Sequence, residues 1–339
     1  MSNFKTGLVL GKFLPPHRGH QWLIETALAQ CERLTVLACS LAREPIDGAL
    51  RHAWLSEMFP AARVIHVTDE NPQYPHEHPQ FWDIWRGTVL RHTDEPIEAV
   101  FTSEDYGDEL ARQLGARHIL LDLGRARFPV SGTAIRANPL ANWEFIPEAV
   151  RPYFVKRIAV VGPESTGKST LAEQLATHFQ TVWTPEYGRE YVDTHPLNEL
   201  TLTDIESIAH GHRANEERDA RRANKLLFCD TDLLTTTVWS NHLFAECPAW
   251  IETAARAAPY DLTLLLTPEV AWVKDEQRVG FGFSRAFYQN LSRKLISYGR
   301  EVLVISGSDY AAREAASVTA INKRYALSLP AFRVTPSGV

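Results

Sequence analysis

The stretch Gly162-Pro163-Glu164-Ser165-Thr166-Gly167-Lys168-Ser169 decides the fold of the second half of this 339-residue chain. It matches the pattern Gly-x4-Gly-Lys-Ser/Thr in full, follows the apolar run Ile158–Val161 and precedes a helical pattern, which is the context of a phosphate-binding P-loop. In such a loop backbone N–H groups surround the phosphates, the lysine reaches the β- and γ-phosphate oxygens, and the serine hydroxyl ligates Mg²⁺. We therefore expect nucleotide binding by Gly162, Glu164, Ser165, Thr166, Gly167, Lys168, Ser169 and Thr170, with Lys168 catalytic and Ser169 a metal ligand.

Short β-rich runs alternate with stretches of helical periodicity on both sides of this loop. In the second half we expect strands at residues 157–161, 225–229, 262–266 and 301–305 and a helix at 168–179. In the first half we expect strands at 7–13, 34–39, 63–67, 99–103 and 118–123, with helices at 21–31, 48–58, 81–91 and 107–114. This alternation predicts an α/β fold of two tandem doubly wound parallel-sheet domains. The rhythm breaks over the proline-containing residues 138–152, so we place the domains at 1–152 and 153–339.

Two carboxylates end one of the apolar strands in the second half. The segment 226–232 reads Leu-Leu-Phe-Cys-Asp-Thr-Asp, as the carboxylate strand of a phosphotransferase does. We expect Asp230 to be catalytic as a ligand of Mg²⁺. Asp232 is either a substrate contact or the N-cap of a helix beginning at Leu233.

Two further segments carry groups that suit phosphoryl transfer. Pro185–Tyr191 follows a strand, and Glu186 is a candidate catalytic base or ribose contact. Tyr187 and Arg189 are candidate substrate contacts, with simple packing as the alternative for the tyrosine. Arg278 and Arg285 lie in or after a Gly/Phe-rich stretch, where arginines of a mobile loop could cover nucleotide phosphates. An exposed salt-bridged face is the alternative for these arginines.

A pair of histidines follows the first expected strand and opens the first helix. The segment 11–20 reads Gly-Lys-Phe-Leu-Pro-Pro-His-Arg-Gly-His. His17 and His20 could donate hydrogen bonds to phosphate oxygens and stabilise the charge that grows in a pentacovalent transition state. We expect both to be catalytic, with Gly11, Lys12 and Phe13 binding nucleotide; the alternative is that both histidines are ordinary turn residues.

The segment Ser131–Arg136 supports the same site. We expect Thr133 to cap a short helix, with free N–H groups and hydroxyls of Ser131, Gly132 and Thr133 facing a triphosphate and Arg136 catalytic one turn further on. A capped helix start with no ligand is the alternative. The sequence therefore predicts two separate phosphate sites, one in each half.

The composition limits the other classes of function. Lys and Arg total 35 against 41 Asp and Glu, a net charge of −6, which disfavours a broad nucleic-acid surface. The four cysteines, Cys31, Cys39, Cys229 and Cys247, lack the spacing of a zinc site and are expected to be buried thiols. No secretory pattern opens the chain, and no apolar run approaches the ~20 residues of a membrane span. We expect a cytoplasmic protein that does not bind membranes and that could form a homo-oligomer.

The first half resembles the nucleotidyltransferase superfamily, with its HxGH and ISGTxIR signatures, here with Val130 for the first Ile. The segments Gly11–Phe13, Pro45–Arg51 and Thr102–Glu104 are similar to nicotinamide mononucleotide (NMN) adenylyltransferases of the NadR type. The resemblance implies that NMN attacks the α-phosphate of ATP to give NAD and pyrophosphate, with Arg51 as a substrate contact. Trp82 and Trp85 offer a stacking face for a cationic nicotinamide ring, although core packing is the alternative at their i, i+3 spacing.

Four segments resemble the ribosylnicotinamide kinase domain of NadR-like bifunctional proteins. They are the P-loop, Pro185–Glu190 (PEYGRE), Asp230–Asp232 (DTD) and Asp275–Arg278 (D-x-x-R). Where the family pattern has Gly-Leu after the Asp, this chain has Glu276-Gln277. The resemblance implies phosphorylation of nicotinamide riboside to NMN with ATP and Mg²⁺, followed by conversion of NMN to NAD. No helix-turn-helix pattern precedes the first strand, so we expect no DNA binding.

Two other interpretations stay open at this point. The chain could join a nucleotidyltransferase of other acceptor specificity to a different nucleoside kinase, because the phosphate-binding residues are shared among such enzymes. It could also be an NAD-sensing regulator with one inactive site. The complete P-loop with its carboxylate strand disfavours an inactive kinase.

Overall fold

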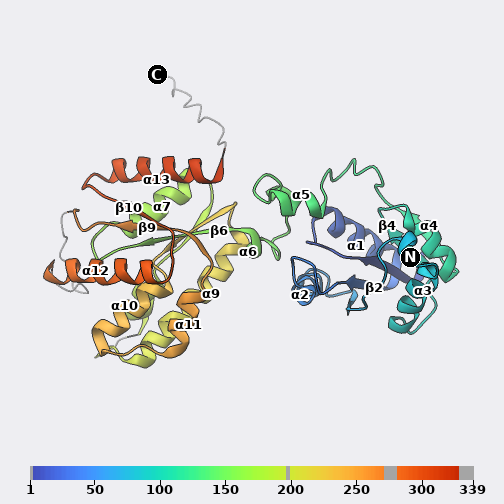
Figure 1. The fold of residues 1–339 in the computed structure, drawn as a ribbon, viewed down its shortest axis with the longest axis horizontal. Coiled ribbons are helices and arrows are strands. Elements are labelled where there is room, and N and C mark those ends of the chain that lie inside the picture. Colours follow the sequence, from blue (N-terminus) through green and yellow to red (C-terminus); the bar gives the residue numbers. More distant parts are fainter. Residues whose placement is uncertain (1–2, 196–198, 271–280, 328–339) are drawn as a thin grey trace, which may run out of the picture. The chain divides into compact units, whose positions relative to one another are not determined.

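The structure, a computed structural model, describes residues 3–195, 199–270 and 281–327. The chain divides into two compact units, Met1–Phe154 and Val155–Val339, two residues beyond the boundary expected from the sequence (Figure 1). We call them unit 1 and unit 2. Each contains its own parallel sheet with helices on both faces, which confirms the predicted fold class.

Unit 1 has a five-stranded sheet in the order β3-β2-β1-β4-β5, with every strand pair parallel. The strands are β1 Phe4–Gly11, β2 Cys31–Cys39, β3 Arg63–Val67, β4 Ala99–Thr102 and β5 Arg117–Leu120. The helices are α1 Arg18–Gln30, α2 Gly48–Met58, α3 Phe81–His92, α4 Tyr106–Leu114, α5 Gly132–Ala137 and α6 Arg151–Phe154, with short 3-10 turns at Pro75–Glu77 and Trp143–Phe145.

The side chains of β1 point alternately to the two faces of the sheet, and their contacts show which helices of unit 1 cover each face. Val9 packs with Ile24 of α1 and Leu55 of α2 on one face. Its neighbour Leu8 packs with residues of α3 and α4, such as Leu110, on the other. Because successive strand residues point to opposite faces, a strand covered on both sides must be apolar throughout, as this one is.

Unit 2 has a second five-stranded parallel sheet, in the order β10-β9-β6-β8-β7. The strands are β6 Lys156–Val161, β7 Val182–Thr184, β8 Leu226–Asp230, β9 Tyr260–Leu266 and β10 Val302–Ile305. The helices are α7 Lys168–His178, α8 Tyr187–Thr194, α9 Leu202–Arg222, α10 Leu233–Phe244, α11 Ala249–Ala257, α12 Phe281–Ser297 and α13 Tyr310–Tyr325. Ile158 and Val160 face α7 and α13, while Ala159 and Val161 face the helices between α9 and α12.

Most of the expected elements lie within a few residues of their observed bounds, and the differences have local causes. β1 begins at Phe4 and ends at Gly11, because Phe4 pairs with Cys31 and the chain turns at Phe13, whose φ is 48°. α1 begins at Arg18 because His17 is its N-cap. β5 ends at Leu120, shortly before Asp122 turns the chain with a φ of 55°.

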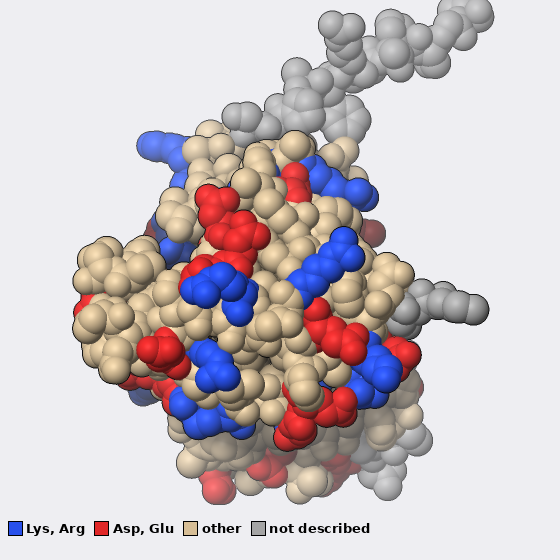
Figure 2. Space-filling view, turned by 90° about the vertical axis from the view of Figure 1, so that its right-hand side faces the viewer, with Lys and Arg blue, Asp and Glu red and all other residues tan. Residues whose placement is uncertain are grey.

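Three further features concern the surface charges, the cysteines and the length of the helices. The face shown in Figure 2 carries basic and acidic side chains side by side, with no continuous stripe of one sign. Cys31, Cys39 and Cys229 are buried, Cys247 is half-buried, and all four are free thiols. None of the helices in the described part of the chain combines the length and the apolar character that crossing a bilayer requires.

Candidate active sites

The P-loop joins β6 to α7 and depends on two glycines with left-handed backbone. Gly162 has a φ of 156° and Gly167 a φ of 83°, conformations that favour glycine. Thr166 Oγ1 and Lys168 Nζ both donate to the carbonyl oxygen of Pro163, at 2.7 and 3.1 Å. These bonds close the loop at the N-terminus of α7, where free N–H groups and the helix dipole favour a phosphate.

Asp230 ends β8 beside the serine of the P-loop. Ser169 Oγ donates to Asp230 Oδ2 at 2.5 Å, while Oδ1 of Asp230 is buried with no hydrogen-bond partner among the described residues. Burial raises the pKa of Asp230 to about 6, although the Lys168 ammonium opposes this shift. A hydroxyl next to a carboxylate with one oxygen to spare suits Mg²⁺, which binds few protein oxygens and completes its shell with water and phosphates. Within residues 3–195, 199–270 and 281–327 there is no group of three or more His, Cys, Asp or Glu side chains that could hold a metal ion by themselves.

Asp232 caps α10, which was one of its two predicted roles. Its Oδ1 accepts from the backbone N–H of Thr235 at 2.8 Å and from the Thr235 hydroxyl at 2.7 Å. The side chain is fully buried, and burial raises its pKa against the effect of these hydrogen bonds. Its second oxygen, Oδ2, is buried and has no hydrogen-bond partner in the described part of the chain, and its substrate contact stays a prediction.

A cavity of about 640 Å³ opens beside the P-loop. Predicted site residues in its wall are Glu164, Ser165, Gly167, Lys168, Ser169, Thr170, Glu186 and Arg189. Its apolar wall consists of Val192, Leu200, Ile205, Ile208, Trp239 and Leu243. A cavity that combines an apolar wall with polar and charged groups is typical of a small-molecule site.

Tyr187 does not contribute to this wall as the structure describes it. Its ring packs against Gly211 of α9, in the space that a Cβ would need, and lies 6.2 Å from the ring of Tyr191. These contacts favour the packing alternative for Tyr187, and its substrate contact stays a prediction. The physical reason is that α8 and α9 cross at a glycine, which admits an aromatic ring.

A buried polar group that sequence reasoning missed lies at the cavity wall. His212 lines the cavity, and its Nε2 donates to Glu216 Oε1 at 3.0 Å. The hydroxyl of Tyr260 donates to the same oxygen. Burial lowers the pKa of His212, but the Glu216 carboxylate outweighs burial and the pKa is raised. The available signal was a His and a Glu four residues apart, on one face of a helix.

The sequence analysis also did not predict a role for Arg313 of α13. Its buried guanidinium donates to the carbonyl oxygens of Thr166 at 2.7 Å, Gly307 at 2.7 Å and Thr267 at 2.8 Å. Thr166 belongs to the P-loop, while Thr267 and Gly307 follow β9 and β10. Because Arg313 and Thr166 are 147 residues apart, no local pattern could reveal the contact.

The two arginines predicted to cover the phosphates have different outcomes. Arg278 lies outside the described residues, as do Glu276 and Gln277. Arg285 is exposed on α12 and is absent from the cavity wall that the described residues form. Its role in binding phosphate stays a prediction.

In unit 1 the predicted histidine pair lies at the start of α1. His17 is the N-cap residue, and its Nδ1 accepts from the backbone N–H of His20 at 3.4 Å. The two rings stack with centroids 3.7 Å apart, and Phe13 meets His20 edge-on at 5.0 Å. The turn therefore fixes both imidazoles at a helix N-terminus, next to the carboxyl end of β1.

Both histidines are neutral near pH 7. Burial and the nearby Arg125 guanidinium lower the pKa of His17 to about 4, and burial, His17 and Arg125 lower that of His20 well below its usual range. Nδ1 of His20 is buried without a hydrogen-bond partner among the described residues. Arg125, which the sequence analysis missed, also lies 3.4 Å from the carbonyl oxygen of Val130. It is a cation between the histidine turn and the segment that follows Val130.

The segment 131–136 forms α5, but its cap differs from the predicted one. Ser131 is the N-cap, and its Oγ accepts from the N–H of Ala134 at 3.1 Å. Thr133 is inside the helix and exposed, because Ser131 is the residue with extended backbone that a cap requires. Arg136 donates to the carbonyl oxygen of Leu14. Gly132 also lies against that oxygen, so α5 and the histidine turn meet.

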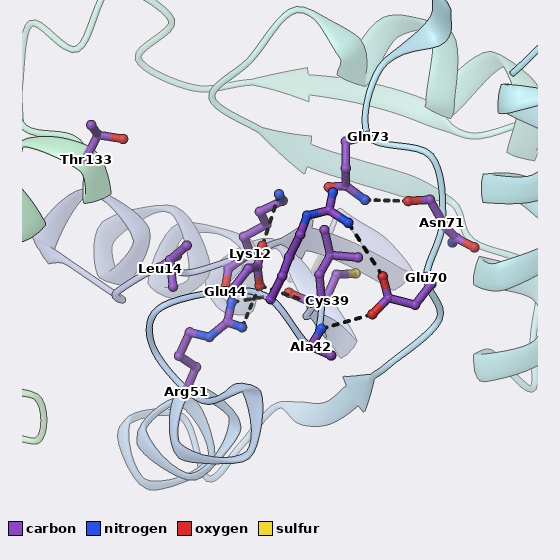
Figure 3. Close-up of polar contacts among 12 residues, drawn as sticks. Lys12, Leu14, Cys39, Ala42, Glu44, Arg51, Glu70, Asn71, Gln73 and Thr133 are labelled. Carbon is purple, nitrogen blue, oxygen red and sulfur yellow. Dashed lines mark hydrogen bonds and ion pairs between the residues drawn. The ribbon is translucent and has the colours of Figure 1, made fainter. Parts of the chain in front are cut away.

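Lys12 and Arg51 share one buried carboxylate, as Figure 3 shows. Glu44 Oε1 lies 3.0 Å from Lys12 Nζ, and Glu44 Oε2 lies 2.7 Å from Arg51 Nη2. Arg51 Nη1 donates to the carbonyl oxygen of Lys12 at 2.6 Å, and only 1% of the side chain is exposed. The donors of Arg51 position Lys12 and Glu44, so these contacts do not favour its predicted substrate contact, which stays a prediction. Lys12 itself is half exposed and can reach a ligand.

The two tryptophans of α3 pack on the sheet. Trp82 and Trp85 are half-buried against the core around Val89 and Leu110, and Trp85 Nε1 donates to the carbonyl oxygen of Pro72 at 2.9 Å. Trp82 meets Phe81 edge-on at 4.9 Å. The predicted stacking face for a nicotinamide is not what these contacts favour; the core alternative fits them, because an i, i+3 pair points to the face that α3 buries.

Taken together, the two sheets and their sites define the class of the molecule: a transferase with two separate phosphate-binding α/β units. Residues 157–313 match the family described as an AAA domain. The trifunctional NAD biosynthesis/regulator proteins NadR of Escherichia coli (strain K12) and Salmonella typhimurium (strain LT2) are each 31% identical to this chain over 330 residues, covering 91% of it and 80% of their own length. The chain belongs to the NadR family.

Two solved structures share the fold along almost the whole chain. One is described as NadR protein in complex with NR, with a TM-score of 0.78, 21% identity and 98% of each chain covered. The other is NadR protein in complex with NAD and AMP-PNP, with a TM-score of 0.76, 21% identity and coverage of 98% of this chain and 99% of that one. At this level of identity the likeness shows the fold.

Proposed function

We propose that the chain is a bifunctional enzyme of NAD salvage, in which unit 2 phosphorylates nicotinamide riboside to NMN and unit 1 transfers AMP from ATP to NMN. The observation that carries the proposal is that each unit brings together candidate phosphate-binding residues of a different kind. Unit 2 places Lys168, Ser169 and Asp230 beside a cavity, and unit 1 places His17 and His20 at the N-terminus of α1. Membership of the NadR family supplies the substrate class.

In the kinase step the riboside occupies the cavity beside the P-loop. Its 5′ oxygen attacks the γ-phosphorus of ATP, the bond from that phosphorus to the bridging oxygen of ADP breaks, and Glu186 accepts the hydroxyl proton. Lys168 compensates the charge on the transferred group. Mg²⁺, when bound by Ser169 and Asp230, neutralises phosphate charge. Trp239 in the wall offers a π face to the cationic pyridinium ring.

In the adenylyl step a phosphate oxygen of NMN attacks the α-phosphorus of ATP and pyrophosphate leaves. His17 and His20 hydrogen-bond to the phosphates where negative charge develops, which is electrostatic rather than covalent catalysis. Ser131, Gly132, Thr133 and Arg136 bind the triphosphate from α5, and Lys12 contacts it after exchanging Glu44 for the ligand. Arg125 adds a further positive charge at the same place.

This assignment makes residues 1–152 the adenylyltransferase domain and 153–339 the kinase domain, in a cytoplasmic enzyme whose ligands are ATP, nicotinamide riboside, NMN and NAD. Arg189, Arg278 and Arg285 are the remaining candidates for contacts to acceptor or phosphates. Arg189 lies in the cavity wall and is therefore a stronger candidate for such a contact than Arg285.

A coupled assay tests the proposal. Purified protein is incubated with ATP, Mg²⁺ and nicotinamide riboside, and NMN and NAD are followed separately. We expect NMN to form first and NAD after it, and NAD to form at once when NMN is supplied. NMN without NAD under both conditions would reduce unit 1 to a binding domain, and the absence of both products would assign the chain to another nucleoside.

A further inference from the structure

The wall of the acceptor cavity of unit 2 contains a buried polar atom that the phosphoryl-transfer chemistry does not use. His212 is 2% exposed and lines the cavity. Its Nδ1 has no hydrogen-bond partner among the residues that the structure describes. A buried polar group without a partner destabilises the protein, and at the wall of a binding site it marks a place for a ligand atom.

The other side of the imidazole is firmly held. Glu216 Oε1 accepts both the Nε2–H of His212, at 3.0 Å, and the hydroxyl of Tyr260 on β9. All three side chains are buried or half-buried, so the contacts are shielded from water. The pair of bonds fixes the orientation of the ring before any ligand arrives, which reduces the entropy lost on binding.

The surroundings of His212 indicate which part of a nucleoside it meets. The carboxylates of Glu186 and Asp232 interact electrostatically with His212, and Asp232 Oδ2 is a second buried oxygen with no partner in the described chain. Vicinal hydroxyls of a sugar both donate and accept, so they can bond to carboxylates and to an imidazole at once. The apolar wall around Ile208 and Trp239 suits the base instead.

We propose that His212 is a specificity-determining residue of the acceptor site, which hydrogen-bonds through Nδ1 to a ribose hydroxyl and so selects ribosides over deoxyribosides. Glu216 and Tyr260 act through it as positioning residues. This inference rests on the proposed kinase function and deepens it, since it assigns the sugar, rather than the base, to this part of the cavity.

The test compares kcat/KM for nicotinamide riboside and for its 2′-deoxy and 3′-deoxy analogues in the full chain. In the unsubstituted protein we expect a preference of about 10- to 100-fold for the riboside over at least one analogue, as for other sites that pair a buried group with a substrate hydroxyl. His212→Phe should lower kcat/KM for the riboside by that factor, leave that analogue unchanged and leave KM for ATP unchanged. The ratio of riboside to analogue then approaches one.

The matched control is His210→Phe. His210 lies two residues away on the same helix, is exposed, and stacks on Trp250 with centroids 4.1 Å apart, so this change should leave the ratio unaltered. Glu216→Gln provides a second test that keeps the His212 ring, and we expect it to reduce the preference severalfold. If His210→Phe changed the ratio of kcat/KM between riboside and analogue, this result would contradict the assignment to His212.

Three results would overturn the inference. The first is an equal loss with riboside and deoxyribosides in the His212 variant. The second is that substitution of His212 changes only the discrimination between ribosides whose pyridine ring carries a carboxamide and those whose ring carries a carboxylate. That result would place His212 at the base. The third is an unchanged preference in Glu216→Gln where the His212 variant does not fold. Failure of the unsubstituted protein to phosphorylate any riboside would instead remove the proposed function, and the inference with it.

Discussion

The two candidate phosphate sites of this chain differ in the groups at their centre, although both have cationic side chains nearby. Unit 2 brings together charged groups: Lys168 at the P-loop, Asp230 against Ser169, and Glu186 in the cavity wall. Unit 1 places two stacked imidazoles, neutral at pH 7, at the N-terminus of α1. Transfer of a terminal phosphoryl group with Mg²⁺ requires compensation of concentrated charge, whereas attack at the α-phosphorus can be assisted by neutral donors. The difference makes each site separately testable.

The largest expected effect is that of Lys168→Ala. Removing the ammonium leaves the γ-phosphate charge uncompensated, and we expect kcat for riboside phosphorylation to fall by about 10³-fold. Formation of NAD from supplied NMN should be unchanged. Both rates are measured on one preparation, and near-normal phosphorylation of the riboside would refute the P-loop assignment.

His20→Ala is the reciprocal change in unit 1. It removes a hydrogen-bond donor at the site of developing charge, so we expect adenylyl transfer to NMN to fall by about 10²-fold or more while phosphorylation stays intact. Parallel assays of the two steps check this expectation. A comparable loss in both would show that the division of labour between the units is wrong.

A pH experiment sharpens the contrast between neutral and charged sites. The pKa of His17 is lowered to about 4 from 6.5, so the unfolded chain binds this proton more readily than the folded one. The stability that His17 contributes is present above pH 6.5 and is lost as the pH falls toward 4, by about 3 kcal/mol.

His17→Asn keeps an N-cap acceptor but removes the titrating ring. We expect the variant to lose less free energy of unfolding than the unsubstituted protein between pH 7 and pH 4.5. Urea denaturation of the full chain at both values measures this difference. Parallel losses in the two proteins would mean that His17 is not a buried neutral imidazole.

The smallest expected effect concerns the support of the P-loop. Arg313→Lys keeps a positive charge but cannot donate to Thr166, Thr267 and Gly307 together, so we expect KM for ATP in the kinase step to rise about tenfold, the cost of roughly one hydrogen bond. The control is Arg324→Lys, at the exposed end of the same helix. Steady-state kinetics distinguish the two variants, and equal KM values would show that Arg313 does not shape the loop.

Local sequence predicted the parts of each site that are local in the chain. The P-loop, the carboxylate strand and the histidine turn each lie within about ten consecutive residues that set their own backbone. The bounds of β3 and α2 match the expected ranges for the same reason, since their periodicity and caps are contained in the segment.

The roles that the sequence missed, or that the structure does not favour, concern residues whose partners are distant in the chain. Arg51 looked like a substrate contact, but its partner Lys12 is 39 residues away. Tyr187 packs on Gly211, and Arg313 reaches Thr166 across most of unit 2. A pattern in the sequence shows which chemistry a side chain can perform, but packing against remote segments decides whether the side chain is free to perform it.

The contacts of Arg313 also have a consequence for the order in which function is acquired during synthesis. The residues of the P-loop leave the ribosome long before α13, yet the guanidinium that joins Thr166 to the ends of β9 and β10 is on that helix. A nascent chain that already contains residues 162–169 therefore lacks the clamp that holds them. Nucleotide affinity in unit 2 should therefore mature only after α13 has been synthesised and has packed against the P-loop.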